Sequence, residues 1–257
     1  MNKLSALFNK KKKDILSIYF TAGYPSLNDT EDILIALEEA GVDFVEVGMP
    51  FSDPVADGPT IQKSSEIALD NGMSLKVLFE QLKNIRSKVS MPIILMGYIN
   101  PVIQYGIENF CKKCHEVGVD GIVLPDMPMQ IYLEEYKSIF EKHQLTNIFL
   151  ITPQSSEERI KWIDSNTSGF IYMVSSFSIT GNTNGFGENQ IAYFNQIKNA
   201  GIVNPTIIGF GISNQHDFKT ACQYANGAII GSAFVKMLGN ATNLRNDINV
   251  FIKNIKH

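Results

Sequence analysis

The sequence predicts an α/β fold, a single-domain (β/α)8 TIM barrel with an extra N-terminal helix, and three observations support this prediction. Eight short apolar segments alternate with helical patterns along the chain. Each segment is a nearly continuous apolar run, as expected for parallel strands buried under crossover helices. The chain has 257 residues, a usual length for eight such units. A doubly wound open sheet is the alternative.

Eight strands are expected, each bounded by glycine, proline or polar turn residues. They cover residues 15–23, 44–48, 92–96, 121–124, 147–151, 169–174, 206–210 and 227–230. The first strand ends at the turn Gly23-Tyr24-Pro25, where glycine and proline favour a change of chain direction.

The helices are predicted from apolar residues spaced three and four apart. They cover an amphipathic stretch before residue 15, then 28–41, 61–69, 75–89, 107–117, 131–143, a helix that begins at 155–158, and one long C-terminal helix after residue 230. Asn28 is an N-terminal capping residue, and Gly41 and Gly118 end their helices. Because no linker or change of composition interrupts the units, residues 1–257 are expected to form one domain.

Composition narrows the range of partners. Hydrophobic residues make up 44% and charged residues 19% of the chain, which indicates a large core. The net charge of -4 and a pI of about 5.6 argue against a nucleic-acid or anionic-membrane surface. No apolar run reaches membrane-spanning length, and the N-terminus lacks the apolar segment of a signal peptide. These features predict a cytoplasmic protein. Its three cysteines are expected to be free thiols.

Glu46 lies inside the apolar strand 44–48, on the same face as Phe44 and Gly48. An unpaired buried carboxylate is costly, so such a residue is paired, protonated or held at a cavity. The loop that follows carries three prolines and can hold a second carboxylate, Asp57, at a set position. The pair fits a catalytic site. A salt-bridged strand glutamate followed by an Asp/Pro-rich turn is the plainer alternative.

Barrels of this type carry their active sites on the loops that follow the strands. The polar candidates there are Glu46, Asp57, Tyr98, Asn100, Asp126, Tyr172 and Thr180. All four histidines fall in helical stretches or at the terminus, which argues against a metal site. No lysine follows a strand, as a Schiff-base enzyme would need, and no Ser or Cys has a nearby His. Proton transfer by carboxylates and tyrosines remains.

Glycine pairs end the seventh and eighth strands, in 209–213 and 227–232. Barrels commonly bind phosphate at this place through backbone N–H groups, and Gly181 could complete the site. The glycines could instead serve only to make tight turns. The polar, glycine-rich segment 178–187 is expected to act as a lid, or else to be a plain surface loop.

The segment 50–62, preceded by Glu46, closely resembles the signature of the tryptophan synthase alpha subunit family. Four further motifs of that family occur in the same order, at 20–25, 98–101, 125–128 and 209–213. The resemblance implies a lyase of L-tryptophan biosynthesis that cleaves indole-3-glycerol phosphate to indole and glyceraldehyde 3-phosphate without a cofactor. It implies that Glu46 transfers the protons and that Asp57 stabilises positive charge at the indole nitrogen. We hypothesise that an apolar setting raises the pKa of Glu46.

The resemblance also implies binding residues and a partner. Phosphate contacts are implied for Gly181, Phe210, Gly211, Gly231 and Ser232, and pocket contacts for Phe20, Tyr98, Tyr172 and Thr180. The implied partner is a beta subunit that holds pyridoxal phosphate (PLP), in an alpha2beta2 heterotetramer, with contacts around Asp53, Pro54, Asn100 and Pro128. The segment 175–181 departs from the family pattern, because serines stand at positions 176 and 178 where members often carry an arginine and a glycine. This departure concerns lid closure and signalling between the subunits.

Two other functions remain possible from the sequence. A phosphosugar isomerase or epimerase could use the same barrel and phosphate site, although a metal-dependent epimerase needs histidines at strand ends. A non-catalytic partner that only activates another subunit is the second alternative. The presence of both Glu46 and Asp57 argues against it.

Overall fold

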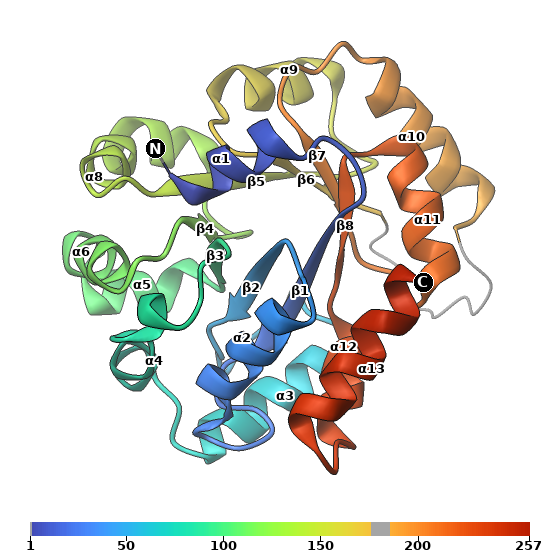
Figure 1. The fold of residues 1–257 in the computed structure, drawn as a ribbon. Coiled ribbons are helices and arrows are strands. Elements are labelled where there is room, and N and C mark those ends of the chain that lie inside the picture. Colours follow the sequence, from blue (N-terminus) through green and yellow to red (C-terminus); the bar gives the residue numbers. More distant parts are fainter. Residues whose placement is uncertain (1, 176–185) are drawn as a thin grey trace.

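A computed structural model describes residues 2–175 and 186–257 and shows a closed barrel of eight parallel strands surrounded by helices (Figure 1). The strands are β1 (Ile15–Thr21), β2 (Phe44–Gly48), β3 (Ile93–Met96), β4 (Gly121–Val123), β5 (Thr146–Ile151), β6 (Ile171–Val174), β7 (Thr206–Gly209) and β8 (Gly227–Ile230). Each strand pairs with its neighbour in sequence, and β8 pairs with β1. The predicted (β/α)8 barrel is confirmed, because an open doubly wound sheet would leave two unpaired edges.

Side-chain alternation divides the interior into two cores. On β2, Phe44 belongs to the cluster inside the barrel, whereas Val45 and Val47 belong to the cluster between the strands and the helices. Glu46 shares the face of Phe44, as the strand pattern predicted, and therefore faces the barrel interior.

The outer layer consists of helices that connect successive strands. The α-helices are α1 (Lys3–Lys10), α2 (Asp29–Glu39), α3 (Pro59–Asp70), α4 (Leu75–Leu82), α5 (Ile99–Tyr105), α6 (Ile107–Val117), α7 (Met129–Ile131), α8 (Lys137–Lys142), α9 (Glu157–Asn166), α10 (Glu188–Asn199), α11 (Gln215–Tyr224), α12 (Ser232–Gly239) and α13 (Leu244–Lys256). A 3-10 turn covers Ile85–Ser87, and a π-helical turn covers Tyr132–Tyr136. Of the residues described, none lie in a helix with the length and hydropathy needed to cross a bilayer.

The predicted helices needed four corrections. The expected single C-terminal helix is two helices, because α12 ends at Gly239 and Asn243 caps α13 by accepting from the Asn246 N–H at 3.1 Å. The helix expected at 75–89 stops at Leu82. The helix expected at 131–143 is α7, the π-helical turn and α8. Finally, α5 was not predicted, although proline is tolerated in a first helical turn, where Pro101 lies.

The extra N-terminal helix, α1, closes the end of the barrel where the strands begin (Figure 1). Its Leu4 and Phe8 are buried in the inner cluster. The Phe8 ring lies 5.6 Å from that of Phe170 and 6.3 Å from that of Phe44. Aromatic packing therefore seals this end against water.

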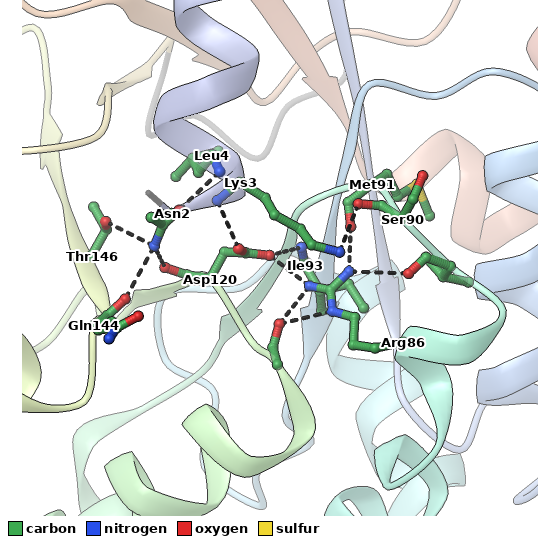
Figure 2. A network of polar contacts seen from close by, with 12 residues as sticks. Asn2, Lys3, Leu4, Arg86, Ser90, Met91, Ile93, Asp120, Gln144 and Thr146 are labelled. Atoms are coloured by element: carbon green, nitrogen blue, oxygen red, sulfur yellow. Dashed lines mark hydrogen bonds and ion pairs between the residues drawn. The ribbon is translucent and has the colours of Figure 1, made fainter.

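A polar network fastens α1 to the barrel (Figure 2). Asp120, just before β4, accepts hydrogen bonds from Arg86 at 2.6 Å, from the Lys3 N–H at 3.2 Å and from the Ile93 N–H at 3.0 Å. Asn2 donates to the Asp120 carbonyl at 2.6 Å. Burial raises the pKa of Asp120, and the Arg86 charge opposes that rise. The network stabilises this end of the barrel and leaves the opposite end, where the strands finish, for chemistry.

Candidate active site

Glu46 lies at the centre of β2 and is fully buried. Neither of its carboxyl oxygens has a hydrogen-bond partner among the residues that the structure describes. Burial raises the pKa of Glu46 to about 8, because an apolar environment disfavours the charged form. Glu46 is therefore mostly protonated at neutral pH, as an acid catalyst needs to be.

Asp57 lies in the loop between β2 and α3, which positions it through its own backbone. The Asp57 N–H donates to the Pro54 carbonyl at 3.1 Å, and Gln62 donates to the Asp57 carbonyl at 2.8 Å. Burial raises the pKa of Asp57 to about 6, against a hydrogen bond from Tyr98 that lowers it. Glu46 and Asp57 thus differ in pKa by about two units, so between those values one is an acid and the other is ionised.

Tyr98 connects this loop to the end of β3. Its hydroxyl donates to Asp57 Oδ2 at 3.2 Å and accepts from the Ala56 N–H at 3.0 Å. The next residue, Ile99, begins α5, and its N–H donates to the Asp126 carboxylate at 2.9 Å. Asp126, predicted as a candidate catalytic residue, therefore holds the backbone beside Tyr98.

A pocket opens at the carboxyl ends of the strands beside Asp57. It is lined by Tyr19, Met49, Phe51, Asp57, Ser65, Met96, Gly97, Tyr98 and Pro125. The Phe51 ring lies 5.2 Å from that of Tyr98, which forms an aromatic wall. Its lining combines apolar side chains with polar groups, as the lining of a small-molecule site does.

The prediction that Phe20 lines the pocket is wrong, and Tyr19 lines it instead. Phe20 is fully buried in the cluster between the strands and the helices. Tyr19, on the other face of β1, packs against the inner cluster and lines the pocket. Since adjacent strand residues point to opposite faces, only one of the two can reach the site. The sequence pattern does not distinguish Tyr19 from Phe20, because these adjacent residues are both aromatic.

Tyr172, on β6, points into the same interior and is 3% exposed. Its hydroxyl lies over Gly209 of β7, where a Cβ would come within 2.2 Å of it. Burial raises the pKa of Tyr172, and the carboxyl of Glu46, the phenol of Tyr19 and the carboxyl of Asp57 raise it further. Tyr172 thus stays a neutral hydrogen-bond donor near both carboxyl groups.

The residues predicted to bind phosphate lie at the ends of β7 and β8. Phe210 and Gly211 have left-handed φ angles of 69° and 74°, and the Ser175 hydroxyl donates to the Phe210 carbonyl at 2.7 Å. Gly231 is the N-cap of α12, whose first residue is Ser232. A helix N-terminus with free N–H groups favours a phosphate.

Two predicted binding residues, Thr180 and Gly181, lie outside the described residues. The altered segment at Ser176, Phe177 and Ser178 also lies there, as does most of the expected lid, 178–187. These predictions remain expectations from the sequence.

The four residues predicted to contact a partner come from the connections that follow β2, β3 and β4. Asp53, Asn100 and Pro128 are exposed and Pro54 is half-buried. Large apolar side chains are exposed in the same three connections, with Val55 at 88% and Ile103 at 51%.

Comparison with known proteins indicates one family. The family model "Tryptophan synthase alpha chain" matches residues 5–256. The tryptophan synthase alpha chain of Flavobacterium psychrophilum is 60% identical over 238 residues, 93% of this chain and 94% of the relative. Within residues 2–175 and 186–257, no three His, Cys, Asp or Glu side chains form a group that could hold a metal ion.

Solved structures of the same family share the fold. Subunit alpha of tryptophan synthase from Legionella pneumophila superposes with a TM-score of 0.90 at 30% identity, covering 99% of this chain and 97% of that one. A chain of the tryptophan synthase complex from Pyrococcus furiosus gives a TM-score of 0.86 at 34% identity, covering 95% of this chain and 98% of that one. Sequence and fold agree over nearly the whole length, and the chain belongs to the tryptophan synthase alpha chain family.

Proposed function

We propose that this chain is the lyase subunit that cleaves indole-3-glycerol phosphate to indole and glyceraldehyde 3-phosphate in L-tryptophan biosynthesis, with Glu46 and Asp57 as its catalytic residues. One observation carries the assignment of roles. Glu46 is a fully buried carboxyl group without a hydrogen-bond partner among the described residues, and it faces the interior of the barrel. A structural carboxylate at such a position would be paired.

The two pKa values divide the work between the carboxyl groups. Protonated Glu46 donates its proton to C3 of the indole ring, and the positive charge that develops at the ring nitrogen is stabilised by ionised Asp57. Glu46, now a carboxylate, takes the proton of the C3′ hydroxyl. The bond between C3′ and the ring breaks, its electron pair restores the indole, and the aldehyde of glyceraldehyde 3-phosphate forms. Glu46 ends protonated, ready for another cycle.

The remaining predicted residues bind the substrate in this proposal. Tyr98 and Tyr172 contact the indole and glycerol groups, for which their places after β3 and on β6 are suited. Phe210, Gly211, Gly231 and Ser232 bind the phosphate, supported by the left-handed backbone at the end of β7 and the N-terminus of α12. Thr180 and Gly181 are assigned to the same two subsites from the family resemblance alone.

The partner is the tryptophan synthase beta subunit, in an alpha2beta2 heterotetramer, with Asp53, Pro54, Asn100 and Pro128 at the contact. We propose that PLP is bound by the beta subunit and that this chain itself works without a cofactor. We also propose that residues 1–257 form one domain and that the enzyme is cytoplasmic. The three free thiols, Cys111, Cys114 and Cys222, are in keeping with a reducing compartment.

The test is indole release from indole-3-glycerol phosphate by the purified chain, with and without the beta subunit. We expect slow release alone and faster release with the partner. The Glu46→Gln variant should lose at least about 100-fold in kcat, while Glu108→Gln, an exposed change on α6, should not. No release from the folded wild-type chain in either condition would reject the lyase. Activation of the beta subunit or isomerisation of a phosphosugar would then identify the alternative.

A further inference from the structure

Tyr19 is the aromatic residue closest in register to the catalytic glutamate. On the paired strands β1 and β2, the Cα of Tyr19 lies opposite that of Glu46. Both side chains face the barrel interior, and Tyr19 also lines the pocket that contains Asp57. Tyr19 therefore lies opposite Glu46 in the barrel and shares a pocket with Asp57.

The Tyr19 hydroxyl lies close to Gly48. A Cβ built on Gly48 would lie 2.2 Å from this oxygen, so only glycine leaves room for the phenol at this point. Gly48 is two residues beyond Glu46, where β2 runs into the loop that carries Asp57. The phenol thus extends across the end of β2 toward that loop.

The groups that face Tyr19 come from four other parts of the barrel. Glu46 lies on β2, Asp57 lies on the following loop, Tyr98 follows β3, and Tyr172 lies on β6. Burial raises the pKa of Tyr19 and the Asp57 carboxylate raises it further, a side-chain hydrogen bond with Thr21 lowers it, and Glu46 and Tyr98 add smaller increases. The phenol therefore keeps its proton throughout the range in which Asp57 ionises.

Asp57 has room for another donor. An ionised carboxylate can accept about four hydrogen bonds, and the Asp57 side chain accepts one from Tyr98. We propose that Tyr19 is a positioning residue whose hydroxyl donates a second hydrogen bond to ionised Asp57. This inference rests on the proposed function, because it explains how the buried Asp57 is kept ionised for catalysis.

The test compares the wild-type chain with Tyr19→Phe, which removes only the hydroxyl. The first readout is the titration of Asp57, followed by carbon-13 NMR of carboxyl-labelled aspartate and assigned with Asp57→Asn. We expect the pKa of Asp57 to rise by about one unit in Tyr19→Phe, because a hydrogen bond to a charged group is lost. An unchanged titration would overturn the proposal. This readout does not depend on activity, so it is separate from any failure of the lyase assignment.

The second readout is the pH dependence of kcat/KM for indole release with the beta subunit present. Loss of the donor should move the acidic limb up by about one pH unit, so that kcat/KM falls about tenfold at pH 5 and about twofold at pH 7. A residue that only fills space would lower the curve equally at every pH, and that result would reject the proposal. Tyr132→Phe is the matched control, since the Tyr132 ring packs on Phe140 and Phe149 in the outer layer.

Discussion

The Tyr98 hydroxyl donates to Asp57 Oδ2 at 3.2 Å, and the oxygen of the Tyr98 hydroxyl accepts from the Ala56 N–H at 3.0 Å. One side chain from the end of β3 therefore holds both the carboxylate and the backbone of the loop that follows β2. This relationship sets the position of Asp57 and lowers its pKa relative to burial alone.

Replacing Tyr98 with phenylalanine should raise the pKa of Asp57 and loosen its loop. We expect the acidic limb of kcat/KM to move to higher pH by about one unit, together with a fall in kcat at the optimum as Asp57 loses its fixed position. Steady-state kinetics from pH 5 to pH 9 measure both effects. Tyr105→Phe, at the other end of α5, is the control; an equal effect there would show that α5 packing is responsible.

The wild-type enzyme should show a bell-shaped pH profile. Activity requires Asp57 ionised, which holds above a pKa of about 6, and Glu46 protonated, which holds below a pKa of about 8. We therefore expect kcat/KM to be greatest near pH 7 and to fall on both sides. A curve that stays flat up to pH 9.5 would contradict the assignment of Glu46 as the acid.

Because of Glu46, the free energy of unfolding should fall as the pH rises. Its pKa is raised from 4.5 to about 8 on folding, so between these values the native state holds a proton that the unfolded state has released. Stability from this group is complete below pH 4.5 and is lost as the pH rises toward 8. At pH 7 Glu46→Gln should be more stable than wild type by about 3 kcal/mol.

Urea unfolding of both proteins at pH 5 and pH 7 measures this difference. The advantage of Glu46→Gln should be small at pH 5 and larger at pH 7. An advantage that is the same at both pH values would mean that Glu46 does not titrate in this range.

Arg86→Met should destabilise the barrel without altering the chemistry. Arg86 pairs with the buried Asp120 at 2.6 Å and donates to the Gly118 and Met91 carbonyls. Removing one partner of a buried pair leaves a charge uncompensated, so we expect a loss of about 3 kcal/mol in unfolding free energy.

The control for this prediction is Lys113→Met, which breaks the exposed pair with Glu116 and should cost less than about 1 kcal/mol. Because the Asp120 network lies at the end of the barrel opposite the pocket, kcat/KM of folded Arg86→Met should stay within about twofold of wild type. A large loss of activity in the folded variant would show coupling between the two ends.

Much of the architecture was predictable from local patterns. Continuous apolar strands and glycine-ended helices follow from short-range physics, and the period of two on β2 correctly placed Glu46 on the same face as Phe44. The break between α12 and α13 was also predictable, because Gly239 and the capping residue Asn243 mark it in the sequence. The error there was to extend one helical pattern through clear stop and start signals.

The sequence by itself determined the order of the units, the face that Glu46 shares with Phe44, and the family. Only the tertiary structure decided between Tyr19 and Phe20, because two adjacent aromatic residues satisfy the pattern of β1 in either direction and the pairing of β1 with β2 and β8 selects one. The contact of Tyr98 with Asp57 was likewise decided by the barrel, since they are 41 positions apart in the chain. Proton affinities depend on such distant neighbours and on burial, which arise only when the chain closes into the barrel.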